Sequence, residues 1–93
     1  LDYVAAPFIR GGLKRPKLVI RKMSKRWGSF TAKGRLVLNV DLIRAGLDQI
    51  DYVICHELAH YYYPNHGSDW QKTIQKFMPD WEMRKKSLEN KLR

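Results

Sequence analysis

All three histidines of the chain fall within eleven positions, in the stretch HELAHYYYPNH at residues 56–66. His56 and His60 stand four residues apart, so on a helix they point the same way and suit two imidazole nitrogens that converge on one zinc ion. Glu57 projects beside such a metal, where its carboxylate can accept a proton from a metal-held water molecule. His66 is the candidate third ligand, which leaves a fourth position open. The pattern therefore predicts a catalytic zinc site.

The same HExxH pattern also occurs by chance in ordinary helices, where the histidines are solvated and the glutamate is a surface charge. Here a helix expected at about 48–62 carries an apolar stripe at spacings of three and four, formed by Ile50, Ile54, Leu58 and Tyr61. Both histidines of the motif face away from that stripe. Because Cys55 is the single cysteine, a closed cysteine-rich zinc site is excluded, and Cys55 itself is expected in the core.

The segments before the histidines have the composition of β-strands. KLVIRKM at 17–23, WGSFT at 27–31 and RLVLN at 35–39 are short runs of β-branched, aliphatic and aromatic residues. The last two are separated by a tight connection at Lys33-Gly34, which predicts a hairpin. The preceding RGGLKRP at 10–16 has two glycines and a proline, so we expect residues 1–16 to be a flexible or poorly anchored arm.

Helices are expected to follow the sheet and to position the histidines. Asp48 is expected to cap the histidine helix, and Pro64 to end it, so that the turn PNHG delivers His66. Ser68 and Gln71 fit a capping box for the next helix.

A last helix is expected from about Asp80, after the break at Pro79, to about residue 91. Strands first and helices after indicate an α+β fold, and 93 residues suffice for one domain spanning 1–93. Three large rings are expected to anchor its core: Trp27, Trp70 and Trp81.

The charge of the chain is concentrated in its first half. From Tyr3 to Val40 there are ten Lys and Arg residues and no acid, and the net charge is +9. Such a field favours nucleic acid or acidic peptide partners, although it also suits a merely solubilising face. No apolar run reaches membrane-spanning length. A single cysteine without a signal-peptide pattern favours a cytoplasmic location.

Three segments together resemble a known family: KRWGSFTAKGRLVLN at 25–39, IDYVICHELAHYYYPNHGSDWQ at 50–71 and PDW at 79–81. They resemble the YgjP-like metal-dependent hydrolases, relatives of the SprT-like zincins, over about 25–93. The resemblance implies a minimal zincin fold, with the metal helix packed against a small sheet. It also implies a zinc site with the general base Glu57 and the ligands His56, His60 and His66. The chain departs from the family at SDWQ, where a phenylalanine is usual, and this concerns the packing under His66.

We therefore expect a zinc-dependent hydrolase, first of all a metallopeptidase, with a peptide or protein substrate lying along the hairpin edge around 35–39. Side chains near the ligands suggest two supporting roles. An oxyanion donor is expected among Tyr61, Tyr62 and Tyr63. Acceptors for the ligand N–H groups are expected among Asp51, Asn65 and Asp69. Two alternatives stay open: a basic nucleic-acid-associated module with a structural or vestigial metal site, and a hydrolase of a nucleotide or another non-peptide substrate.

Overall fold

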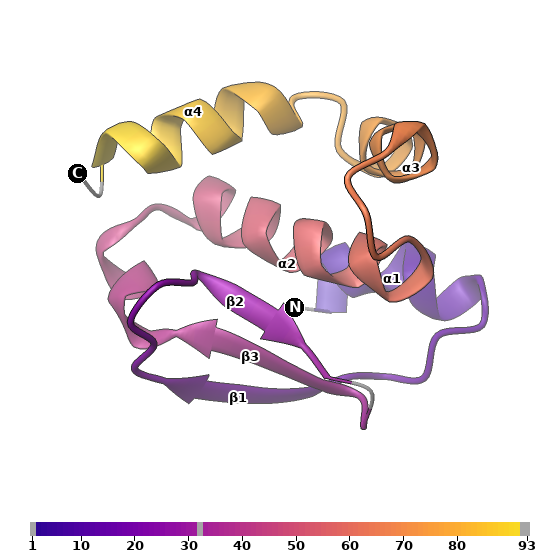
Figure 1. Ribbon diagram of the computed structural model, residues 1–93, viewed down its shortest axis with the longest axis horizontal. Coiled ribbons are helices and arrows are strands. Elements are labelled where there is room, and N and C mark those ends of the chain that lie inside the picture. Colours follow the sequence, from indigo (N-terminus) through magenta and orange to yellow (C-terminus); the bar gives the residue numbers. More distant parts are fainter. Residues whose placement is uncertain (1, 32, 92–93) are drawn as a thin grey trace.

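The computed structural model describes residues 2–31 and 33–91, and it has the expected α+β architecture (Figure 1). The sheet lies on one side of the central helix α2, and α3 and α4 lie on the other side (Figure 1). In the described part of the chain no helix is long and apolar enough to span a membrane. The elements in chain order are α1 Asp2–Arg10, β1 Lys17–Arg21, β2 Gly28–Phe30, β3 Arg35–Asn39, a 3-10 helix at Val40–Arg44, α2 Leu47–Tyr62, α3 Ser68–Phe77 and α4 Trp81–Lys91.

The three strands are arranged in the order β1-β3-β2. Strand β3 pairs with β2 in the expected antiparallel hairpin and with β1 in parallel. The expectation that a substrate strand pairs along 35–39 is therefore wrong, because both edges of β3 are already hydrogen-bonded within the sheet. The outer strands of the sheet are β1 and β2, and only they can offer an edge to another strand.

The connection from β1 to β2 passes the end of β3, where Asn39 fixes it. The buried Asn39 side chain donates from Nδ2 to the carbonyl oxygens of Met23 and Arg26, both at 2.8 Å. Its backbone N–H donates to the carbonyl oxygen of Trp27 at 2.9 Å. Because these acceptors follow one another along the connection, Asn39 sets the backbone position of Arg26 and Trp27.

Residues 2–10 form helix α1, so the expectation of a poorly anchored arm is wrong. Phe8 is only 2% exposed, and its ring packs edge-on against Phe77 at a centroid distance of 4.9 Å. Val4 and Ala5 are buried with it, at the spacing of one helix face. Gly11 and Gly12 only end this helix, and Gly12 adopts a φ of 110° there. Leu1 lies outside the described residues.

Two expected helix caps are also wrong. Helix α2 begins one residue earlier than expected, with Gly46 as its N-cap, and the Gln49 side chain accepts the Gly46 N–H at 3.0 Å. Asp48 therefore lies inside the first turn, where its negative charge interacts favourably with the positive end of the helix dipole. Helix α3 begins at Ser68 with Gly67 as N-cap and without a side-chain cap, so the capping box of Ser68 and Gln71 does not form.

Candidate metal centre and active site

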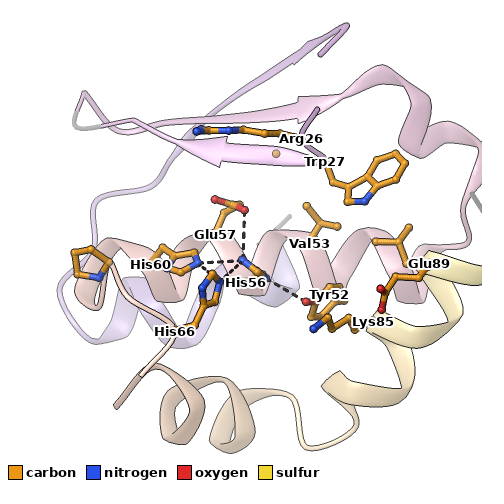
Figure 2. A pocket seen from close by; sticks show the side chains of 13 residues that line it. Arg26, Trp27, Tyr52, Val53, His56, Glu57, His60, His66, Lys85 and Glu89 are labelled. Atoms are coloured by element: carbon orange, nitrogen blue, oxygen red, sulfur yellow. Dashed lines mark hydrogen bonds and ion pairs between the residues drawn. The ribbon is translucent and has the colours of Figure 1, made fainter. Parts of the chain in front are cut away.

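The three histidine side chains converge on one point (Figure 2). The Nε2 atoms of His56 and His60 are 3.0 Å apart, those of His60 and His66 are 2.8 Å apart, and those of His56 and His66 are 3.2 Å apart. Nitrogen ligands of a tetrahedral zinc ion, each bonded at about 2.0–2.1 Å, stand about 3.3 Å from one another. The spacing and donor type of the three nitrogens therefore fit a zinc ion.

Local structure accounts for this convergence. Helix α2 presents His56 and His60 one turn apart, and it ends at Tyr62, as expected before Pro64. The backbone N–H of Tyr63 still donates to the Ala59 carbonyl at 3.0 Å, after which the chain leaves the helix. The following turn brings His66 back against the two helical histidines.

Hydrogen bonds at Nδ1 orient two of the rings. Nδ1 of His60 lies 3.1 Å from the carbonyl oxygen of Tyr63, which can only accept, so this nitrogen carries the proton and Nε2 keeps its lone pair. Nδ1 of His56 lies 3.1 Å from the hydroxyl oxygen of Tyr52. With Nδ1 engaged in both rings, Nε2 is the nitrogen left for a metal.

These partners differ from the expected ones. For His56 and His60 the observed partners are the Tyr52 hydroxyl and the Tyr63 carbonyl, and not any of Asp51, Asn65 and Asp69. The contact between Tyr52 and His56 could have been predicted from the sequence, because Tyr52 stands four residues before His56 and so lies one turn away on the same helix face. The Tyr63 carbonyl could not be predicted in this way, because every residue has a backbone carbonyl and the residue type does not reveal which one accepts a hydrogen bond.

Trp70 fills the space beneath the three imidazoles. Its ring centroid lies 5.1 Å from that of His56, 5.4 Å from that of His60 and 4.7 Å from that of His66. The buried indole stacks on His60, and its Nε1–H donates to the His56 carbonyl at 3.4 Å. Trp70 is the expected core anchor, and in this chain it supplies the packing under His66.

Glu57 lies beside the nitrogen cluster, with Oε2 3.9 Å from Nε2 of His56. Burial raises the pKa of Glu57 to about 7, against the opposing effect of Arg26. Burial, followed by the neighbouring His60, His66 and Lys85, lowers the pKa of His56 to about 4. The imidazole is thus held neutral at pH 7, as a metal ligand must be.

The neighbours of this cluster have structural roles. Cys55 is buried, as expected, and burial raises the pKa of its thiol to about 12. Tyr61 packs against Phe30 at a centroid distance of 5.5 Å, and Tyr62 stacks on Phe8.

A cavity of about 560 Å³ opens over the nitrogen cluster, between the start of β2, helix α2 and helix α4 (Figure 2). Gly28 makes this arrangement possible: a Cβ there would lie 3.0 Å from the Val37 carbonyl oxygen and 3.2 Å from Cγ1 of Val53. Glycine therefore lets β2 approach α2 closely. None of the three tyrosines from Tyr61 to Tyr63 is among the described residues that line the cavity, which leaves the expected oxyanion donor without support.

Three converging histidines, an adjacent carboxylate and an open cavity, set on an α+β scaffold, define the class of metal-dependent hydrolases. The family model of the YgjP-like metallopeptidase domain matches residues 8–91. The chain therefore belongs to the YgjP-like metallopeptidase family.

Two solved structures share the fold. Jannalysin of Methanocaldococcus jannaschii, solved as a metallopeptidase zymogen, has a TM-score of 0.80 and 22% identity, over 99% of this chain and 88% of its own. Abylysin of Pyrococcus abyssi, also solved as a metallopeptidase zymogen, has a TM-score of 0.82 and 23% identity, over 98% of this chain and 92% of its own. A search of curated proteins found no match.

Proposed function

We propose that the protein is a zinc metallopeptidase in which His56, His60 and His66 hold the metal and Glu57 is the general base. The observation that carries the proposal is the approach of three Nε2 atoms to within 2.8–3.2 Å of one another beside this carboxylate. A zinc ion bound there would lower the pKa of a water molecule and polarise the carbonyl group of a substrate.

Glu57 is suited to move a proton in both directions near neutral pH, because burial raises its pKa to about 7. As general base it takes a proton from the attacking water and then delivers it to the amine that leaves. Arg26 acts against the effect of burial and so helps to keep the carboxylate ionised before the reaction.

The substrate backbone is proposed to lie along β2, at residues Gly28–Phe30. This short strand is at the outside of the sheet, and Gly28 lines the cavity. An extended peptide that adds to this edge would gain main-chain hydrogen bonds, and its scissile bond would pass over the nitrogen cluster. Family membership favours a peptide over a nucleotide or another non-peptide substrate.

The test has two parts. Metal analysis of the purified protein after reconstitution is expected to give one zinc per chain, and His66→Ala is expected to lose it. Zinc-loaded protein is expected to cleave a mixture of unstructured peptides, and Glu57→Gln to retain zinc but lose cleavage by at least about a hundredfold. Substoichiometric zinc in the wild type refutes the ligand set, and undiminished cleavage by Glu57→Gln refutes the base.

Nucleic acid is a second candidate partner, because the connection from β1 to β2 is strongly basic. Residues 21–26, RKMSKR, which run from the last residue of β1 into this connection, form a shallow surface pocket of about 500 Å³, and Arg26 also lines the cavity. Recruitment of the peptidase through this segment predicts DNA or RNA binding by Glu57→Gln that weakens steeply with salt. Binding that is absent at low salt contradicts it. The buried free Cys55 suits a cytoplasmic location, which we propose with the activity.

A further inference from the structure

The cavity extends beyond the nitrogen cluster toward the beginning of α2. Tyr52 and Val53 stand four and three residues before His56, so they continue the same face of the helix by one turn. Figure 2 shows the neighbouring residues Arg26 and Trp27 pointing in opposite directions along the cavity. The Arg26 guanidinium extends over Glu57, and the Trp27 indole extends over Val53. The cavity therefore has a catalytic part and a second part.

This second part, the side pocket, has apolar walls. It is lined by Trp27, Gly28, Tyr52, Val53 and Leu88. Val53 and Leu88 are buried hydrophobic residues from α2 and α4, and Trp27 packs partly against the same core. The hydroxyl of Tyr52 is already engaged by Nδ1 of His56. A side chain that enters this pocket therefore meets mainly apolar surface.

The charged residues of the side pocket are confined to its rim. Lys85 and Glu89 are both exposed, and they stand four residues apart on α4, so opposite charges lie on successive turns. Exposed charges of opposite sign are screened by solvent and attract a charged side chain only weakly. Burial of a large apolar side chain is worth more, and corresponds to a preference of about 10- to 100-fold over alanine.

We propose that the side pocket is the specificity site of this enzyme and takes a large apolar, best an aromatic, side chain next to the scissile bond. The proposal rests on the peptidase function proposed above. Trp27 is the specificity-determining residue, because its indole is the largest side chain that lines the pocket and offers a face for ring stacking. The backbone N–H of Asn39 holds the Trp27 carbonyl at 2.9 Å, and the Trp27 side chain packs against the core, so both the main chain and the side chain of this wall are supported without a substrate.

The first experiment measures kcat/KM of the zinc-loaded protein on peptides that differ only in the residue beside the scissile bond: Phe, Leu, Ala, Lys or Glu. Phe and Leu are expected to exceed Ala by at least about tenfold. In Trp27→Ala the ratio of Phe to Ala is expected to fall to within about threefold, and Trp27→Phe is expected to restore most of it. The matched control, Tyr62→Ala, removes an exposed aromatic ring that does not line the cavity and is expected to keep the ratio. Preference for Lys or Glu, or an unchanged ratio in Trp27→Ala, overturns the proposal.

A second experiment does not depend on turnover. The indole N–H signal of Trp27, assigned by its loss in Trp27→Phe, is followed by NMR while N-acetyl-phenylalanine amide or N-acetyl-alanine amide is added. A saturable shift with the phenylalanine amide alone is expected. If this shift is seen but no peptide is cleaved, the pocket stands and the peptidase function fails. If neither amide shifts the signal, or both shift it equally, the side pocket is refuted.

Discussion

The hydroxyl of Tyr52 is expected to strengthen metal binding through His56, which makes Tyr52→Phe an informative change. The substitution removes a single oxygen that lies 3.1 Å from Nδ1 of His56. Tyr52 is 5% exposed, so phenylalanine fills the same buried volume and the core is otherwise kept. Any change in metal affinity then reports on the hydrogen bond alone.

The magnitude follows from the position of this hydrogen bond. Loss of an outer-shell partner of a metal-binding histidine typically weakens metal affinity by about 10- to 100-fold. Tyr52 also lines the cavity, so water can partly replace the missing oxygen. We therefore expect the zinc Kd of Tyr52→Phe to rise by about 10- to 30-fold, equivalent to about 1.4–2 kcal/mol.

The assay is competition for zinc with a chromophoric chelator at pH 7.4, combined with urea unfolding of the metal-free proteins. The control is Tyr61→Phe, which removes the same atom from a ring that is 51% exposed and packs on Phe30. The control is expected to keep the wild-type Kd. A rise of less than about threefold in Tyr52→Phe, with both metal-free variants as stable as the wild type, would refute the orienting role of the hydroxyl.

Two substitutions and one measurement on the unchanged protein test the packing of the core. Phe8→Ala is expected to lower the free energy of unfolding by about 3–5 kcal/mol in urea titrations, because Phe8 is fully buried, and a loss below about 1 kcal/mol would mean that α1 is not anchored. Gly28→Ala is expected to cost about 1–3 kcal/mol, because the added Cβ would meet a carbonyl oxygen at 3.0 Å, and an unchanged thermal midpoint would contradict this. Cys55 is expected to react with Ellman's reagent at pH 8 only as fast as the protein unfolds, since burial raises its pKa to about 12. Because the pKa of Cys55 is raised in the folded state, the protonated thiol stabilises the fold fully below the ordinary thiol pKa of 9.0, and this stabilisation is lost as the pH rises from there toward about 12. The free energy of unfolding is therefore expected to be lower at pH 10 than at pH 7.

The convergence of the three histidines was largely predictable because its geometry is local in sequence. His56, Glu57 and His60 are placed by one helix, and Pro64 dictates the turn that returns His66 to them. The sheet hairpin and the order of strands followed by helices after residue 16 were predictable for the same reason, since each depends on neighbouring segments, whereas helix α1 before the sheet was not predicted.

What the sequence did not reveal depends on contacts between distant segments. The burial of Phe8 requires the rings of Phe77 and Tyr62, which belong to helices far along the chain. The central position of β3 is decided by its pairing with β1, and a pattern of apolar residues does not specify which strand is in the middle. Likewise the backbone position of Trp27 is fixed by Asn39, which the sequence presents only as the end of a strand.

The strand order also determines when the strands can pair during synthesis of the chain. In the sheet β1-β3-β2 the middle strand is the last to leave the ribosome, and β1 and β2 are not bonded to each other. The nascent chain therefore has no strand partner for either until residues 35–39 emerge. A chain that stops or pauses before Arg35 holds two unpaired, partly apolar strands, which is a state open to aggregation. Once RLVLN is complete, both pairings can form. The side chain of its last residue, Asn39, then holds the connection that carries one wall of the cavity over the histidines.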